Sequence, residues 1–418
     1  MHPASLASLA HAAIGGGPGG PDDHDWRTAD ASTLAAALQA SRQDTLAHVA
    51  RLRAALPGLQ VPQRPTLNPP LWELGHIGWF QEFWLARNPQ RADGASADPL
   101  APRAAPLRPG ADALYDSSAV PHASRWTLPL PDADATLADL AAQLQQTLRL
   151  LASAGADDAA LYFFRLALAH EDMHHEAGLY MAQALGIAVD DARWQAPRLA
   201  GPPAPLSFVA GAWLLGSRGP GFAFDNEQGA HAVDLPATCI DAQAVRWAEF
   251  LPFAEAGGYA DARLWTAAGN AWRLATGATT PLHLRRIDGA WQQWRHGRWQ
   301  ALDLAEPACH LTAHEAAAWC RWAGRRLPAE AEWERAAVTG GPAFRWGDAW
   351  EWTASTFAPF PGFTAHPYRD YSQPWFDGRP VLRGGSFLTQ PRMKHPRYRN
   401  FFPSHRNDVP AGFRSCAL

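Results

Sequence analysis

Residues 169–176 read Ala169-His170-Glu171-Asp172-Met173-His174-His175-Glu176 and lie within a stretch of strong helical character. Side chains four residues apart lie on the same face of a helix, one turn above the other. His170 and His174 are therefore placed to bind one metal ion through two ring nitrogens. A third ligand has to come from a neighbouring helix, and His76 is the best candidate. Three neutral imidazoles with coordination positions left open suit catalysis better than a structural role.

The first half of the chain has the pattern of a helical bundle. Apolar spacing and the stop signals around it predict helices over about 32–56, 70–87, 137–151 and 158–185, with 88–133 as a long ordered loop. Four helices with metal ligands that project inward are a known way to build a bundle site. Residues 1–28 are rich in Gly, Pro, Ala and Asp and are expected to be a disordered leader, which leaves 29–194 for the bundle.

The second half of the chain changes character. Residues 195–206 carry four prolines that interrupt helical periodicity, as a linker does. From 207 to 418 the chain is rich in Gly, Trp and Phe, with short apolar runs between turn signals and clear helices only near 313–323 and 329–338. An irregular domain with few long strands is expected, so the predicted fold class is α+β.

Composition excludes several classes of protein. The 418 residues favour two domains, and the net charge of −4 leaves no footprint for nucleic acid or an anionic membrane. No apolar run is long enough to span a bilayer, and no basic flank with an apolar core marks a secretory signal. The four cysteines form no CxxC pair, which argues against a disulfide framework and fits a reducing cytosol. We expect a cytoplasmic protein whose partners are small molecules.

Two families share motifs with this chain. The first half resembles a DinB-type four-helix bundle, with His76 and the His170-x-x-x-His174 pair at that family's metal positions. The second half resembles the formylglycine-generating-enzyme (sulfatase-modifying factor) domain, a variant of the C-type-lectin-like fold. That second likeness is carried by Gly216-Ser217, Phe224-Asp225-Asn226-Glu227, the run 319–334, Trp350-Glu351-Trp352-Thr353, Arg383-Gly384-Gly385-Ser386 and Ala411-Gly412-Phe413-Arg414.

The fusion of these two domains is similar to the ergothioneine-type sulfoxide synthases. That resemblance implies a mononuclear nonheme iron(II) centre on the three bundle histidines, with O₂ as co-substrate. It also implies oxidative bond formation between a sulfur donor and carbon 2 of the hercynine imidazole. An additional structural calcium ion in the lectin-like domain is left open.

Three other functions fit the sequence less well. Formylglycine generation needs cysteines after Arg383-Gly384-Gly385-Ser386, and residues 387–394 contain none. A DinB-type thiol transferase has no use for the fused second domain. A non-catalytic glycan-binding or small-molecule-binding protein has no reason to gather three histidines at one point.

Substrate residues are implied by the family segment that corresponds here to 399–406. Asn400 matches a residue that binds the betaine carboxylate of hercynine. Phe401 replaces a Trp that packs on the trimethylammonium group, and it still offers a weaker cation–π face. For Asn400 and Phe401, a purely structural role in the loop is an alternative of equal weight to substrate binding. Arg406 keeps a family position and either binds a donor group or forms only a salt bridge.

The departures from the family concern the donor. Phe402 stands where the family has an Asp that helps to hold glutamylcysteine, and residues 112–122 replace a basic segment used on the same donor. Met173 stands where the sulfur enzymes often have Gln. Burying donor carboxylates against Phe402 is costly. We therefore expect a neutral 1-seleno-sugar as donor, as in the selenoneine synthase branch, with a thiol such as γ-glutamylcysteine as the alternative.

Supporting roles follow for a few further residues. The family uses a Tyr of the lectin-like domain as a proton donor, and Tyr368 and Tyr371 are the candidates, Tyr368 first. Glu73 and Glu176 are expected to orient ligand imidazoles through their second ring nitrogens. His175 is turned about 100° from His174 around the helix and is not expected to be a ligand.

Overall fold

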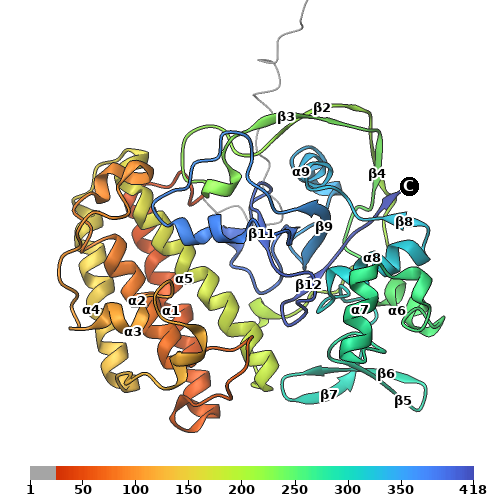
Figure 1. Cartoon of the computed structure of the whole chain (residues 1–418), viewed down its shortest axis with the longest axis horizontal. Coiled ribbons are helices and arrows are strands. Elements are labelled where there is room, and N and C mark those ends of the chain that lie inside the picture. Colours follow the sequence, from red (N-terminus) through yellow and green to blue (C-terminus); the bar gives the residue numbers. More distant parts are fainter. Residues whose placement is uncertain (1–24) are drawn as a thin grey trace, which may run out of the picture.

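The computed structural model describes residues 25–418, so most of the predicted leader lies outside the described residues. Four long helices gather on one side of the molecule, and the mixed strands and helices of the second half lie on the other (Figure 1). The long helices are α1 (Ala31–Ala55), α2 (Pro70–Trp84), α4 (Ala133–Ala152) and α5 (Asp158–Leu185). All four helices were predicted, with ends that differ by four residues or fewer.

Caps fix the ends of α5, the helix that carries two of the candidate ligands. The Asp157 side chain accepts a hydrogen bond from the backbone N–H of Ala160 at the start. Gly186 ends the helix in the left-handed region, at φ 72°. The helix therefore begins and ends where its local sequence dictates.

The connection between α2 and α4 is more structured than a loop. It contains the short helix α3 (Ala111–Tyr115) and the 3₁₀ turns η3 (Arg91–Ser96) and η4 (His122–Trp126). Asp112 accepts hydrogen bonds from the Arg87 guanidinium and from Trp79 Nε1, which fastens α3 onto α2. This attachment matters because α3 ends beside the candidate metal ligands.

The second half contains two four-stranded sheets, a two-stranded hairpin and a three-stranded hairpin sheet within the described residues. The first sheet has the order β1 (Leu206–Phe208), β4 (Thr238–Ile240), β13 (Cys416–Ala417), β8 (Arg325–Arg326), and the second β11 (Asn400–Phe401), β10 (Pro380–Arg383), β9 (Trp350–Thr356), β12 (Ala411–Gly412). β2 (Gly211–Leu215) pairs with β3 (His231–Leu235), and β5 (Leu284–Ile287) pairs with β6 (Ala290–Arg295), which pairs with β7 (Arg298–Ala301). The strands are short, as the sequence predicted.

Four helices accompany these strands. The helices α8 (Ala313–Trp322) and α9 (Glu330–Thr339) were predicted, whereas α6 (Trp247–Glu255), α7 (Ala267–Thr276) and the β5–β7 sheet were not. Pro252 lies inside α6 and Gly269 inside α7, and both residue types have low helix propensity. The α7 helix forms because Thr266 caps its first turn.

The two halves share one hydrophobic core. The largest cluster of buried apolar side chains combines Phe163 and Leu166 of α5 with Trp350 and Phe413 of the second half. Buried polar contacts cross the same boundary, such as the Arg27–Glu227 ion pair. The position of α5 relative to the second half is therefore fixed by packing. No helix among residues 25–418 is both long and apolar enough to cross a membrane.

Substituting Gly75 by Ala is expected to destabilise the bundle. A methyl group at Gly75 would overlap the ring of Tyr115, whose side chain is 4% exposed and has no room to move. The expected loss of unfolding free energy is about 1–3 kcal/mol, although Ala is the better helix former. Urea unfolding measures it. Gly211→Ala, at an open position in β2, is the control, and equal stability of both variants would contradict the prediction.

Candidate metal centre

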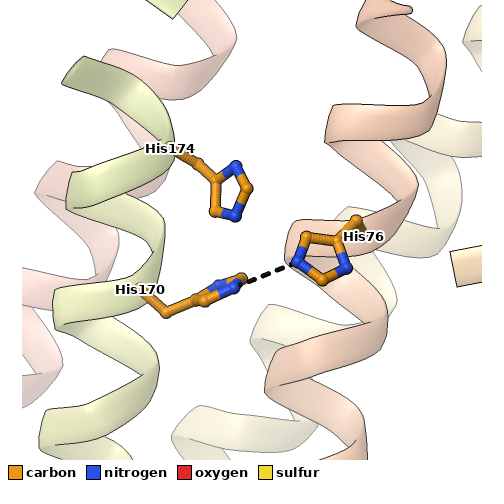
Figure 2. A group of neighbouring side chains, drawn as sticks. All are labelled: His76, His170 and His174. Atoms are coloured by element: carbon orange, nitrogen blue, oxygen red, sulfur yellow. Dashed lines mark hydrogen bonds between the residues drawn. The ribbon is translucent and has the colours of Figure 1, made fainter. Parts of the chain in front are cut away.

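Three histidines from two helices meet inside the bundle. His76 lies on α2, and His170 and His174 lie one turn apart on α5, with their rings turned toward His76 (Figure 2). One ring nitrogen of each lies within 4.8 Å of the others, and His170 Nε2 is 3.2 Å from His76 Nε2. Within residues 25–418 this is the one group of three or more His, Cys, Asp or Glu side chains gathered closely enough to hold a metal ion. No second such group supports the calcium ion that the family resemblance left open.

On two of the histidines a hydrogen bond from Nδ1 places the proton there, so that Nε2 can accept. His76 Nδ1 lies 2.8 Å from the carbonyl oxygen of Tyr115, and because a carbonyl only accepts, Nδ1 carries the proton. His174 Nδ1 likewise donates to Glu73 Oε2 at 2.5 Å. A ring that carries its one proton on Nδ1 presents a lone pair on Nε2, as a metal ligand needs. The expected orienting role of Glu73 agrees with this contact.

Aromatic rings stack on two of the three histidines, His76 and His170, and both of these histidines are buried. Phe80 stacks on His170 with centroids 3.6 Å apart, and Trp72 stacks on His76 at 4.8 Å. Burial, and secondarily the nearby His174, lowers the pKa of His76 to about 3 and the pKa of His170 well below 6.5. Burial alone would raise the pKa of Glu73, but the nearby His174 ring and the hydrogen bond from it outweigh burial and lower that pKa. Glu73 therefore faces the histidines as a carboxylate anion.

The donor set fits a transition metal ion. Metal–imidazole bonds are about 2 Å long, so nitrogens that share an ion lie roughly 3 to 4 Å apart. The spacing of the three imidazoles is close to this without rearrangement of either helix. A three-histidine set leaves coordination positions for substrates.

The two candidate tyrosines lie differently. The Tyr368 ring is 4.9 Å from Phe80 and 6.4 Å from His170, centroid to centroid, so it reaches the metal centre from the second half. Tyr371 stacks on Phe224 at 4.3 Å and donates a hydrogen bond to the Tyr398 hydroxyl at 3.5 Å. Burial raises the pKa of both tyrosines, so both are protonated at neutral pH. Only Tyr368 is adjacent to a predicted ligand.

The predicted substrate residues of the 399–406 segment make mostly internal contacts. Asn400 Oδ1 accepts from the backbone N–H of Phe401 at 2.8 Å. The Phe401 ring stacks on Phe357 at 4.0 Å, and the Arg379 guanidinium lies 6.0 Å from its centroid. These neighbours compete for the face that a trimethylammonium group would use. The substrate roles of both residues stay predictions.

Three further residues were predicted to concern the donor: Met173, Phe402 and Arg406. Arg406 makes a bidentate ion pair with Asp408 and donates to the Tyr180 hydroxyl at 3.4 Å. Its guanidinium carbon also lies 4.5 Å from the centroid of Phe402. Met173 is half-buried on the main core. Of the two roles predicted for Arg406, the structure contains the salt bridge.

Glu176 does not orient a ligand imidazole, and that prediction was wrong. Its Oε1 accepts from Trp350 Nε1 at 2.7 Å and from the hydroxyls of Ser386 and Thr389 at 3.1 and 2.8 Å. Two residues along a helix correspond to a turn of about 200°, so Glu176 faces away from His174. It joins the bundle to the second half instead.

A pocket lies behind the metal centre, between α1, α2 and α5. Glu73 and His174 form part of its lining, together with the buried side chains of Thr45, His48 and His175. Among the described residues no partner is found for the Thr45 hydroxyl or for either ring nitrogen of His48 and His175. Burial lowers the pKa of His48 to about 3 and that of His175 to about 4. The group of three histidines close enough to share an ion does not include His175.

Comparisons with known proteins agree with this architecture. The DinB superfamily model matches residues 37–182, and the sulfatase-modifying factor enzyme 1-like domain model matches residues 197–348. Fold and site together define a DinB-type bundle with a three-histidine centre, fused to a sulfatase-modifying-factor domain.

Sequence similarity over most of the chain identifies the family. A hercynine oxygenase of Mycolicibacterium thermoresistibile is 33% identical in an alignment that covers 84% of this chain and 87% of that protein. A hercynine oxygenase of Mycolicibacterium smegmatis is 32% identical in an alignment that covers 91% of this chain and 98% of that protein. A formylglycine-generating enzyme of Streptomyces coelicolor is 36% identical over only 146 residues, 31% of this chain and 46% of that protein. The chain belongs to the hercynine oxygenase family.

Removing any one of His76, His170 or His174 is expected to abolish tight metal binding. Each alanine variant leaves two imidazoles, so affinity for Co²⁺, used as a visible-absorption probe, should fall by roughly 100-fold or more. His175→Ala is the control, since it lies beside His174 but outside the ligand set. Equal affinity of the His174→Ala and His175→Ala proteins would exclude the three-histidine centre.

The stability of the metal-free protein is expected to fall with acid. Unfolded His48 takes up a proton below its ordinary pKa of 6.5, whereas folded His48 stays neutral down to about 3. Unfolding is therefore favoured as pH falls through this window, by up to about 1.4 kcal/mol per pH unit for each such histidine. Urea unfolding between pH 7.5 and 5 should show a shallower dependence for His48→Leu. An unchanged slope would mean that His48 is not held neutral.

Proposed function

We propose that this protein is an iron(II)- and O₂-dependent enzyme that joins carbon 2 of the hercynine imidazole to a chalcogen donor, with a 1-seleno-sugar as that donor. The observation that carries the reaction type is the close approach of His76, His170 and His174 in a chain of the hercynine oxygenase family. The identity of the donor is a more specific proposal. It rests on the side chains of Phe402, Arg406 and Tyr180.

Atoms and electrons balance for this reaction. A selenol R–SeH and the C2–H of hercynine react with O₂ to give R–Se(O)–C2 and water. One oxygen atom enters the selenoxide and the other leaves as water, so O₂ accepts the four electrons released. Bound iron(II) would supply the open coordination positions at which O₂ and the donor come together.

The protein's own side chains support such a reaction in three ways. The Tyr115 carbonyl and Glu73 keep two imidazoles in the tautomer that binds metal. Phe80 and Trp72 exclude water from the ligand set. Tyr368, protonated and adjacent to Phe80, is placed to give a proton to reduced oxygen near His170.

A neutral donor is favoured by the charges on the donor side. The Arg406 charge is already neutralised by Asp408, so a donor carboxylate gains little from it. Phe402, at the family's Asp position, offers an apolar face that suits a sugar ring and not a carboxylate. Tyr180 adds a hydroxyl beside this face for a sugar hydroxyl group. The rival is a thiol donor such as γ-glutamylcysteine, as in the ergothioneine pathway.

A competition assay separates the two donors. Anaerobic iron(II)-loaded protein receives hercynine with 1-seleno-N-acetylglucosamine, its thio analogue and γ-glutamylcysteine, and mass spectrometry reads the products after O₂ is admitted. The hercynine–selenium adduct should dominate, and Phe402→Asp should shift products toward γ-glutamylcysteine more than Phe402→Leu does. A dominant glutamylcysteine sulfoxide would replace the selenium assignment by the rival. No adduct from any donor with iron bound would reject the reaction itself.

Replacing Tyr368 by Phe is expected to slow turnover by roughly 100-fold, because it removes the proton donor while keeping the ring. Tyr371→Phe, whose hydroxyl bonds to Tyr398, should cost much less. Initial rates of product formation at saturating hercynine measure both variants. A larger loss in Tyr371→Phe would reverse the assignment.

A further inference from the structure

A chain of hydrogen bonds links η4, on the connection between α2 and α4, to a metal ligand. Arg125 Nη1 donates to Asn68 Oδ1 at 2.9 Å, and Asn68 Nδ2 donates to Glu73 Oε1 at 2.5 Å. The other oxygen of Glu73 accepts from His174 Nδ1 at 2.5 Å. In each of these three hydrogen bonds a donor faces an acceptor. The series ends at the His174 ring, whose Nε2 is directed toward the other two histidines.

The same guanidinium also touches the support of a second ligand. The Arg125 guanidinium carbon lies 3.7 Å from the centroid of Trp72, and Trp72 stacks on His76 with the rings 9° from parallel. Among the described residues Arg125 forms no ion pair with a carboxylate, and its buried Nε has no partner. Arg125 therefore interacts with Asn68 and Trp72. Asn68 bonds to Glu73, which holds His174 of α5, and Trp72 stacks directly on His76 of α2.

We infer that Arg125 is a positioning residue for the metal centre, acting through Asn68 and Glu73 on His174 and through Trp72 on His76. This inference rests on the metal centre of the proposed function and not on the identity of the donor. It assigns a role to a residue within the predicted loop, where the sequence offered no functional signal.

The chemistry of the amide explains why Arg125 is needed. An asparagine side chain has one accepting and one donating end, and either orientation fits the same space. A guanidinium only donates and a carboxylate only accepts, so Arg125 and Glu73 together fix Asn68 in one orientation. With Nδ2 held on Oε1, the other oxygen of Glu73 keeps His174 in the Nδ1–H tautomer.

A second arginine of the bundle provides a matched control. Arg103 also packs on aromatic rings, 4.8 Å from Phe83 and 5.1 Å from Trp84, and also donates to an asparagine, Asn88 Oδ1 at 3.2 Å. No hydrogen bond of Arg103 or Asn88 reaches the histidine triad or Glu73 within residues 25–418. Loss of Arg103 therefore reproduces the packing change without the link to a ligand.

The experiment compares Arg125→Met, Arg125→Lys, Asn68→Asp and Arg103→Met with the full-length wild-type chain. In metal-free protein, long-range ¹H–¹⁵N NMR reads the tautomer of His174, assigned by its loss in His174→Gln. Arg125→Met and Asn68→Asp should lose the pure Nδ1–H tautomer, Arg125→Lys should restore much of it, and Arg103→Met should keep it. Affinity for Co²⁺ should fall by about 10-fold or more in the first two variants and not in Arg103→Met.

Two outcomes would overturn the inference. One is an unchanged His174 tautomer and Co²⁺ affinity in Arg125→Met. The other is an equal loss in Arg125→Met and Arg103→Met, which would show a general packing effect. Failure of wild-type protein to bind Co²⁺ would instead reject the metal centre of the proposed function, and the tautomer measurement would still decide the role of Arg125.

Discussion

Burial of two imidazoles, His76 and His170, against aromatic rings is the constraint on which the rest of the site depends. A protonated histidine in this place would have to be desolvated beside two others, which the lowered pKa values of His76 and His170 express. A metal-binding imidazole needs a fixed tautomer, and the Tyr115 carbonyl and the Glu73 carboxylate each hold a proton on Nδ1, of His76 and of His174 respectively. The metal-binding geometry is thus prepared by the bundle before any ion arrives.

Helix α5 connects the histidine site to the second half of the chain. One face carries His170 and His174, while Asp172 and Glu176 on other faces bind Arg392, Trp350, Ser386 and Thr389 of the second half. Breaking such a buried pair typically costs about 3–5 kcal/mol, so α5 is held firmly from both sides. The second half in turn places the Tyr368 ring 6.4 Å from His170, centroid to centroid.

The sequence predicted the parts of the site that depend on local helix geometry. His170 and His174 share a face because they are four residues apart, and the four long helices follow from apolar spacing. Tyr115 and Arg125 were not found because their roles depend on the path of the 88–133 connection, which tertiary contacts such as Arg87–Asp112 determine. The prediction for Glu176 failed because its position two residues after His174 turns it about 200° away around the helix. In the second half the motifs predicted the class of domain. The helices α6 and α7 were missed because each contains a residue of low helix propensity, Pro252 and Gly269 respectively.

Anomalous diffraction at the iron absorption edge tests the central claim most directly. Crystals of the full chain, loaded anaerobically with iron(II), should show one strong anomalous peak within about 2.3 Å of Nε2 of His76, His170 and His174. An iron peak elsewhere, or one bound to only one of these imidazoles, would contradict the account of the bundle as a prepared three-histidine centre.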